Sequence, residues 1–142
     1  MEILVALTLF VSLAMTSGEV FQSGVVSQTC MQCMCDQESR GCNPLDCQMD
    51  GGSLSCGYFQ IKRHYYTDCG SPGSGWESCA KDLACASGCV QTYMGKYVNK
   101  KGCSSNCESV ARLHNGGPRG CQKPSTDRYW AAIVGQGCSA NS

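Results

Sequence analysis

The sequence CDQESRGCNPLDCQMDGGSLSCGYFQIK, residues 35–62, contains the features that predict the fold. Its two important carboxylic acids have different settings. Glu38 comes shortly before Gly41, which predicts the end of a helix, and Asp50 directly precedes the turn pair Gly51-Gly52. Four cysteines of the same stretch constrain the backbone around both acids. We therefore predict that the two carboxyl groups face each other across a cleft, one from a helix end and one from a hairpin.

The cysteine content predicts a disulfide-stabilised protein of an oxidising compartment. The chain has 142 residues, which suits one domain, and 14 cysteines, an even number that allows every thiol to be paired. So high a cysteine fraction in a short chain is typical of a disulfide scaffold, and such bridges persist outside the cytosol. We expect all of these cysteines to be bridged: Cys30, Cys33, Cys35, Cys42, Cys47, Cys56, Cys69, Cys79, Cys85, Cys89, Cys103, Cys107, Cys121 and Cys138.

The spacing Cys30-x-x-Cys33-x-Cys35 has a second interpretation, as a cluster of zinc ligands. Zinc sites built on such a cluster have a further ligand pair at a regular distance downstream, and no C-x-x-C partner follows here. We therefore expect disulfides at these positions, no metal ion and no cofactor.

The N-terminus predicts a secretory leader. Residues 3–15 form the apolar run ILVALTLFVSLAM, which small residues follow and which is too short for a typical membrane-spanning helix. The start carries no Lys or Arg, so only the α-amino group supplies positive charge. We predict a signal peptide over residues 1–20, cleaved between about residues 17 and 20, and a single domain over residues 21–142. No second run of this length occurs, so we expect a secreted, extracellular protein without a membrane span.

The charge balance gives no sign of a partner that requires a strongly basic or strongly acidic protein. The chain has 11 basic and 11 acidic residues, and loss of the leader would remove Glu2 and Glu19, leaving 11 against 9, or +2. A weak positive charge suits an approach to an anionic polymer. The chain has no basic run or aromatic-basic patch, so we expect no nucleic-acid partner.

The helix and strand signals predict an α+β fold, with several short helices and a small antiparallel hairpin or sheet beside the cleft. We expect a first helix over residues 25–39 with Ser27 as its N-cap, and strands over residues 47–50 and 54–61 joined by a tight turn. A carboxylate in the last turn of a helix is disfavoured by the helix dipole, which suggests that Glu38 is placed for chemistry. An ordinary solvated glutamate is the alternative.

The second half of the chain has mainly helical patterns. We expect helical structure over residues 76–98 with Gly88 as a break, and a helix from the capping box at residues 105–108 to about Leu113. A last helix should cover residues 127–134, with Thr126 as its cap. A mainly core-facing stripe is predicted by the helical spacing of Val90, Tyr93, Met94 and Tyr97, with Tyr93 as the candidate exception, and we also place Phe59 in the core.

Five ordered motifs resemble the invertebrate-type lysozymes, also called the destabilase family. They are E-S-x-G-C (residues 38–42), C-x-M-D-x-G-S-L-S-C-G-Y-F-Q-I-K (47–62), D-C-G-x-P-G (68–73), C-V-Q-x-Y-M (89–94) and H-N-G-G-P (114–118). The resemblance runs from about Ser27 to Cys138, nearly the whole chain after the leader. Several motifs in order with matching cysteine spacing are far more specific than one pair of acids.

This resemblance implies a secreted lysozyme that hydrolyses the 1,4-β linkage between N-acetylmuramic acid and N-acetylglucosamine in bacterial peptidoglycan, for defence or digestion. It implies Glu38 as the proton donor and Asp50 as the nucleophile or electrostatic stabiliser, the pair of carboxyl groups that glycoside hydrolysis needs. The expected substrate-binding residues are Lys62, Tyr65, Tyr66, Asp68, Tyr93, His114, Asn115 and Gly116. The expected partner is peptidoglycan, with chitin oligomers as a further candidate ligand, and we expect a monomer or a weak homodimer.

Spacing and resemblance together favour three local disulfides, Cys35–Cys42, Cys47–Cys56 and Cys79–Cys85. Two further functions stay open. Some relatives are reported to cleave glutamyl-lysine isopeptide bonds with a serine–lysine pair, and Ser53 and Lys62 occupy the matching positions. The other alternative is a disulfide-rich glycan-binding protein without catalysis, which the presence of both acids disfavours. His114 could also serve only to bond the last carbonyls of its helix.

Overall fold

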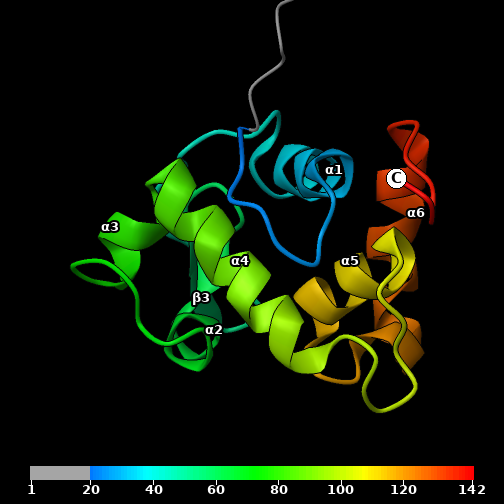
Figure 1. The fold of residues 1–142 in the computed structure, drawn as a ribbon. Helices are drawn as coiled ribbons and strands as arrows, with labels where there is room; N and C mark the ends of the chain where they lie inside the picture. Colours follow the sequence, from blue (N-terminus) through cyan, green and yellow to red (C-terminus); the bar gives the residue numbers. More distant parts are fainter. Residues whose placement is uncertain (1–19) are drawn as a thin grey trace, which may run out of the picture.

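The computed structural model describes residues 20–142, which form six α-helices, two short 3-10 helices and one three-stranded sheet (Figure 1). The predicted signal peptide therefore lies, apart from Val20, outside the described residues. Helix α4 runs between two groups of elements. The sheet, α2 and α3 lie on one side of it, and α5 and α6 lie on the other (Figure 1).

Helix α1, Gln28–Ser39, carries Glu38 in its last turn. The hydroxyl of Ser27 accepts a hydrogen bond from the backbone nitrogen of Cys30, as expected of an N-cap. The helix begins at Gln28 and not at residue 25, because Ser27 has the extended backbone that an N-cap needs. Arg40 has a left-handed backbone and ends the helix, so Glu38 lies two residues before its C-cap.

The sheet is formed by β1 (Gln48–Asp50), β2 (Ser53–Cys56) and β3 (Ile61–Lys62), all antiparallel and in sequence order. Asp50 pairs with Ser53 across the predicted tight turn. The predicted strand over residues 54–61 is wrong in one respect, because a turn at residues 57–60 divides it into two. Gly57 has a φ of 74°, and a Cβ there would lie 1.8 Å from the carbonyl oxygen of Ala80, so only glycine fits.

The helical region after the sheet is divided differently from our prediction. An unpredicted helix α2, Arg63–Asp68, follows β3 directly. Helices α3 (Trp76–Ala80) and α4 (Leu83–Tyr97) separate at Asp82, whose carboxylate accepts from the backbone nitrogen of Cys85 and caps α4. Gly88 lies inside α4 and does not break it. The interruption of the helical region lies earlier, at Lys81 and Asp82, between α3 and α4.

The C-terminal helices are α5 (Cys107–Gly116) and α6 (Asp127–Gly135), with 3-10 turns η1 (Gly120–Gln122) and η2 (Pro124–Thr126) between them. The cap of α5 is Asn106, which accepts from the backbone nitrogen of Ser109, and not the predicted box starting at Ser105. Thr126 precedes α6 as predicted. Its hydroxyl donates to backbone carbonyls at Gly120 and Lys123, so it holds the 3-10 turns and does not cap the helix.

All fourteen cysteines pair, so none remains as a zinc ligand at the start of α1. The three predicted local pairs are present. The bridges are Cys30–Cys107, Cys33–Cys138, Cys35–Cys42, Cys47–Cys56, Cys69–Cys89, Cys79–Cys85 and Cys103–Cys121. The core between them contains fully buried Met31, Met34, Phe59 and Met94, so Phe59 lies in the core as predicted. Within residues 20–142, no helix is long and apolar enough to cross a membrane.

Candidate active site

An open cleft of about 470 Å³ lies between the end of α1, the sheet and α5. Both acids of the deciding stretch line it: Glu38 from the last turn of α1 and Asp50 from the end of β1. Segments 12 residues apart in the sequence thus contribute two carboxyl groups to one cleft. This is the arrangement that the position of Glu38 before a helix end and of Asp50 before a turn predicted.

The two carboxyl groups have different surroundings. The side chain of Glu38 is 17% exposed, and its Oε1 lies 3.4 Å from Nε2 of His114. The side chain of Asp50 is 72% exposed and lies at the tip of the hairpin. Glycosidases need one carboxyl group that delivers a proton and one that stays ionised, and different environments supply that difference. In this cleft Glu38 is the shielded carboxyl group and Asp50 the exposed one.

His114 is a buried side chain behind Glu38, not an exposed sugar ligand, since only 3% of it is exposed. Its Nε2 lies 2.9 Å from the carbonyl oxygen of Phe59 and also faces the Glu38 carboxylate. Both neighbours are acceptors, so Nε2 carries a hydrogen. Its Nδ1 lies 3.0 Å from the hydroxyl of Tyr65, which donates to it when the ring is neutral.

Lys62 holds the hairpin beside Asp50. Its amino group donates to the backbone carbonyl of Asp50 and to the hydroxyl of Ser53, each at 2.7 Å, and lies 3.6 Å from the Asp50 carboxylate. The predicted Ser53–Lys62 pair is therefore in contact. However, a lysine base has to be neutral, whereas this partly exposed amino group is surrounded by oxygen acceptors and acts as a donor.

An aromatic wall, formed by Tyr65, Tyr93 and His114, lines part of the cleft. The rings of Tyr65 and Tyr93 are stacked at 3.8 Å, and the ring of His114 meets Tyr65 edge-on at 5.2 Å. Burial raises the pKa of the Tyr65 hydroxyl well above its ordinary value, and the neighbouring Tyr93, Glu38 and Asp68 add to that shift. Burial likewise raises the pKa of Tyr93. Both hydroxyls therefore stay protonated at neutral pH.

Six of the eight predicted substrate-binding residues line the cleft, and two do not. Those that do are Lys62, Tyr65, Tyr93, His114, Asn115 and Gly116. Tyr66 points away and donates to the carbonyl of Pro72 at 2.7 Å. Asp68 instead accepts hydrogen bonds from Lys96 and Tyr97, which lower its pKa. For Tyr66 the reason is helix α2: successive residues on a helix point about 100° apart, so Tyr65 and Tyr66 cannot share one wall.

Several cleft residues were not among the site residues predicted by name. They are Gln37, Gln60, His64, Gly117, Lys123, Ser125 and Tyr129. Gln37 and Gln60 are neighbours of predicted residues and could have been found by proximity. Tyr129 comes from α6, and nothing in its local sequence distinguishes it from a core tyrosine. Over residues 20–142, no group of three or more His, Cys, Asp or Glu side chains is arranged to hold a metal ion.

A cleft with one shielded and one exposed carboxyl group, on a small disulfide-rich α+β domain, defines a glycoside hydrolase of lysozyme type. Residues 27–136 match the family model described as Destabilase. The lysozyme of Ostrea edulis is 60% identical over 117 residues, covering 82% of this chain and 85% of that protein. The invertebrate-type lysozyme of Ruditapes philippinarum is 53% identical over 122 residues, covering 86% and 90%. The chain belongs to the destabilase family of invertebrate-type lysozymes.

Solved structures show the same fold. The crystal structure of Meretrix lusoria lysozyme in complex with Aeromonas hydrophila PliI superposes with a TM-score of 0.82 at 54% identity, over 86% of this chain and 100% of that one. The crystal structure of Tapes japonica lysozyme gives a TM-score of 0.76 at 55% identity, over 78% and 90%. The predicted α+β lysozyme-like fold is therefore confirmed.

Proposed function

We propose that this protein is a secreted lysozyme that hydrolyses the 1,4-β linkage between N-acetylmuramic acid and N-acetylglucosamine in bacterial peptidoglycan. The observation that carries the proposal is the placement of Glu38 and Asp50 in one open cleft. The relatives named lysozyme support it, as does the disulfide content, which suits an extracellular protein. The leader predicted over residues 1–20 would direct the chain out of the cell.

The reaction needs a proton at the leaving oxygen and a negative charge beside the sugar. Glu38 donates its proton to the glycosidic oxygen as the bond from C1 to that oxygen breaks, and the bonding electron pair leaves with the oxygen. Asp50 stabilises the positive charge that develops on the sugar ring, or bonds to C1. Water then adds at C1, and its proton returns to Glu38, which restores the starting state.

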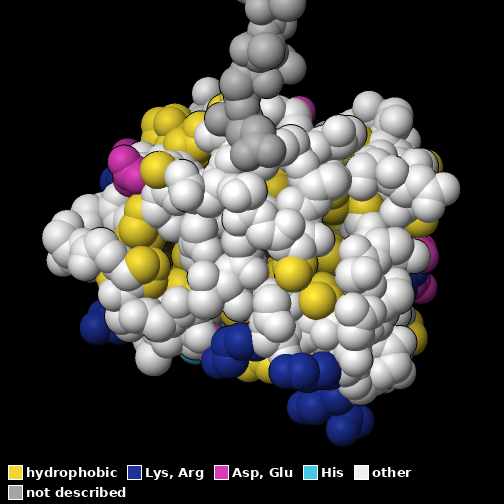
Figure 2. All heavy atoms as spheres, viewed as in Figure 1, with side chains coloured by type: hydrophobic (Ala, Val, Ile, Leu, Met, Phe, Trp, Pro, Cys, Tyr) yellow, Lys and Arg dark blue, Asp and Glu magenta, His cyan; other side chains and the backbone are white. Residues whose placement is uncertain are grey.

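The cleft walls suit a polysaccharide. The stacked, buried rings of Tyr65 and Tyr93 form an apolar part of the lining, while Asn115 and Lys62 offer polar groups. Chitin oligomers, which share the N-acetylglucosamine unit, are expected to bind the same cleft. Lys and Arg side chains gather along one edge of the molecule, under the end of α4 (Figure 2), where Lys96, Lys100 and Lys101 are exposed. That edge would favour approach to an anionic cell wall.

The test is clearance of a bacterial cell-wall suspension by Glu38→Gln and Asp50→Asn. Removing a general acid typically lowers the rate by about a hundredfold or more, so we expect Glu38→Gln to clear the suspension at least that much more slowly. We expect Asp50→Asn to be slowed as well, because the positive charge on the sugar loses its stabilising carboxylate. The matched control is Asp36→Asn on the same helix, since two residues along a helix place a side chain about 200° away. Parental clearance by both site variants would overturn the proposal.

A further inference from the structure

The hydroxyl of Tyr129 is a buried polar group without a hydrogen-bond partner. It is one of only three such side-chain atoms within residues 20–142, with Ser55 Oγ and Arg112 Nε. Buried hydroxyls normally have a partner, because burial takes away the water that would otherwise serve. Tyr129 also lines the cleft, unlike the other two. An unpartnered donor inside the candidate active site calls for a functional explanation.

Tyr129 and Glu38 line the same cleft. The pKa of Tyr129 is raised well above its ordinary value, first by burial, then by the charge of Glu38 and a polar contact with it, and last by Tyr65. The two groups are thus close, although their geometry in this structure does not meet that of a hydrogen bond. The hydroxyl keeps its hydrogen, so once Glu38 is ionised it can donate to the carboxylate.

His114 leaves room for such a donor. Its Nε2–H faces Oε1 of Glu38 at 3.4 Å and is shared with the carbonyl of Phe59 at 2.9 Å, so it engages Glu38 only weakly. An ionised carboxylate has two oxygens and about four acceptor positions, so one shared donor does not satisfy it. After Glu38 has lost its proton, a further donor within the protein would stabilise the new charge, since only 17% of the side chain is exposed.

We propose that Tyr129 is a positioning residue for Glu38, whose hydroxyl donates to the Glu38 carboxylate as that group gives up its proton to the leaving oxygen. The proposal rests on the proposed function, in which Glu38 is the acid. A donor that gains its bond only when charge develops stabilises the transition state more than the ground state, and such a contact raises kcat. Helix α6 thereby contributes to catalysis without touching the substrate.

The test is Tyr129→Phe, which removes one oxygen and keeps every carbon atom. We expect kcat on a soluble peptidoglycan or chitin oligomer to fall about tenfold, the effect of one hydrogen bond to a charged group, with KM little changed. The alkaline limb of the kcat profile should move to higher pH, because the ionised form of the acid has lost a donor. The thermal midpoint should stay the same or rise, because no bond of the resting protein is lost.

The other titratable and charged groups of this cleft are kept constant in that comparison. They are Tyr65 of α2, Tyr93 of α4, His114 of α5, Asp50 and Lys62 of the sheet, His64 and Lys123. The matched control is Tyr97→Phe, which removes a hydroxyl that donates to Asp68 outside the cleft. It should leave kcat and the pH profile unchanged. In a Glu38→Gln background, Tyr129→Phe should have no further effect on the rate, since it acts through Glu38.

The outcomes separate this inference from the proposed function. If Glu38→Gln is inactive while Tyr129→Phe has parental kcat and a parental pH profile, the role of Tyr129 is refuted and the lysozyme assignment stands. A lowered thermal midpoint with an unmoved alkaline limb would also refute it, because that result describes a structural hydroxyl. If Glu38→Gln retains parental activity, the proposed function itself fails.

Discussion

At the scale of single residues, the acidic side chains differ in their exposure and in the groups that surround them. Glu38 is shielded and faces a buried histidine, Asp50 is exposed beside Lys62, and Asp68 lies outside the cleft with two strong donors. Asp68, which the family resemblance implied as a substrate-binding residue, therefore makes structural contacts here. Its carboxylate connects α2 to the end of α4, where it accepts hydrogen bonds from Lys96 and Tyr97.

The Asp68 contact predicts a pH-dependent stability. The hydrogen bond from Lys96 and then that from Tyr97 lower the pKa of Asp68 below its ordinary value of 3.8. A carboxyl group with a lowered pKa contributes stability above its unfolded pKa and loses it as pH falls through its folded pKa. We expect Asp68→Asn to lower the thermal midpoint by a few degrees at neutral pH, or about 1 kcal/mol, and to make no difference in strong acid.

The control for this experiment is Asp46→Asn. Asp46 forms an ion pair with Lys81 on the surface, and its side chain is 93% exposed. Such pairs contribute little, so thermal unfolding of this variant should match the parent at both pH values. Equal effects of the two substitutions at neutral pH would show that the contacts of Asp68 have no special weight.

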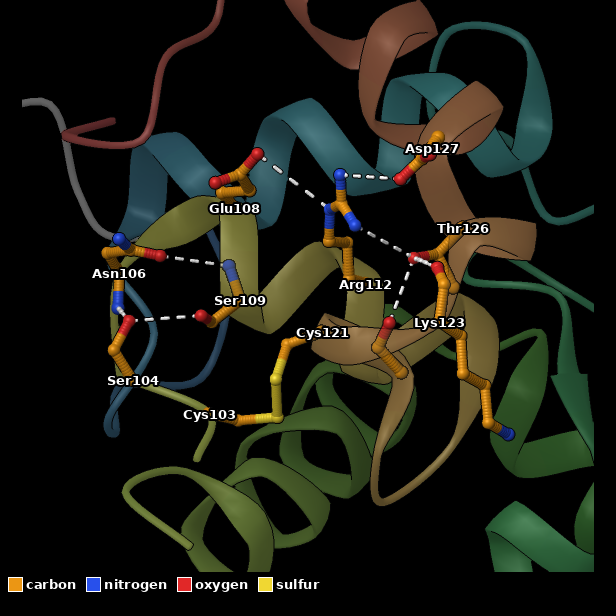
Figure 3. Close-up of polar contacts among 11 residues, drawn as sticks. Cys103, Ser104, Asn106, Glu108, Ser109, Arg112, Cys121, Lys123, Thr126 and Asp127 are labelled. Carbon is orange, nitrogen blue, oxygen red and sulfur yellow. Dashed lines mark hydrogen bonds and ion pairs between the residues drawn. A yellow bond between two sulfur atoms is a disulfide. The ribbon is translucent and has the colours of Figure 1, made fainter. Parts of the chain in front are cut away.

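At the scale of elements, α5 and α6 are joined by one arginine (Figure 3). Arg112 of α5 forms an ion pair with Asp127 at the start of α6 at 2.8 Å, and its Nε lies 3.7 Å from Glu108 one turn earlier. Its other terminal nitrogen lies 3.4 Å from the hydroxyl of Thr126. The arginine is half-buried, so these contacts set how α6 rests on α5. Since α6 carries Tyr129, this contact also fixes one wall of the cleft.

We expect Arg112→Met to lower the free energy of unfolding by about 1 kcal/mol, because it removes the ion pair to Asp127 and the hydrogen bond to Thr126. Urea unfolding followed by circular dichroism measures this. The control is Arg128→Met on α6, an exposed arginine for which no ion pair is found among the described residues, and it should change stability by less than about 0.5 kcal/mol. If the two variants unfold alike, Arg112 does not hold α6 in place.

At the scale of the whole molecule, disulfides hold together a small core. The bridge Cys30–Cys107 spans 77 residues and joins α1 to α5, the two helices that bring Glu38 and His114 together. Cys33–Cys138 spans 105 residues and ties the C-terminal tail to α1. The bridges of short span, such as Cys79–Cys85 with a separation of 6, shape only local turns. Long and short bridges should therefore contribute unequally.

Removing Cys30–Cys107 by a double substitution to alanine should cost about 4–5 kcal/mol, against about 2 kcal/mol for removing Cys79–Cys85, because a longer closed loop restricts the unfolded chain more. Equilibrium unfolding of both double variants in urea gives the comparison. Activity should be lost at lower urea in the first variant, since α1 and α5 meet at the site. Equal losses of stability would contradict the loop-entropy account.

Much of this protein could be predicted from local sequence. The cap at Ser27, the turn at Gly51-Gly52, the near-neighbour disulfides and the family motifs depend on residues close together in the chain. Local spacing and the family resemblance together predicted the α+β fold and both cleft acids. Where a prediction failed, a distant contact decided the outcome. The carbonyl of Ala80 at Gly57 divides the expected second strand, helix α2 turns Tyr66 out of the cleft, and Lys96 and Tyr97 engage Asp68 outside it.

Only the tertiary structure decided which side chains surround Glu38. His114 lies 76 positions and Tyr129 lies 91 positions further along the chain, as the sequence shows. They reach Glu38 because long-range bridges and a buried core pack α5 and α6 beside α1. Local sequence specifies which backbone conformations are favourable, whereas the environment of a carboxyl group depends on burial by residues that no short motif contains.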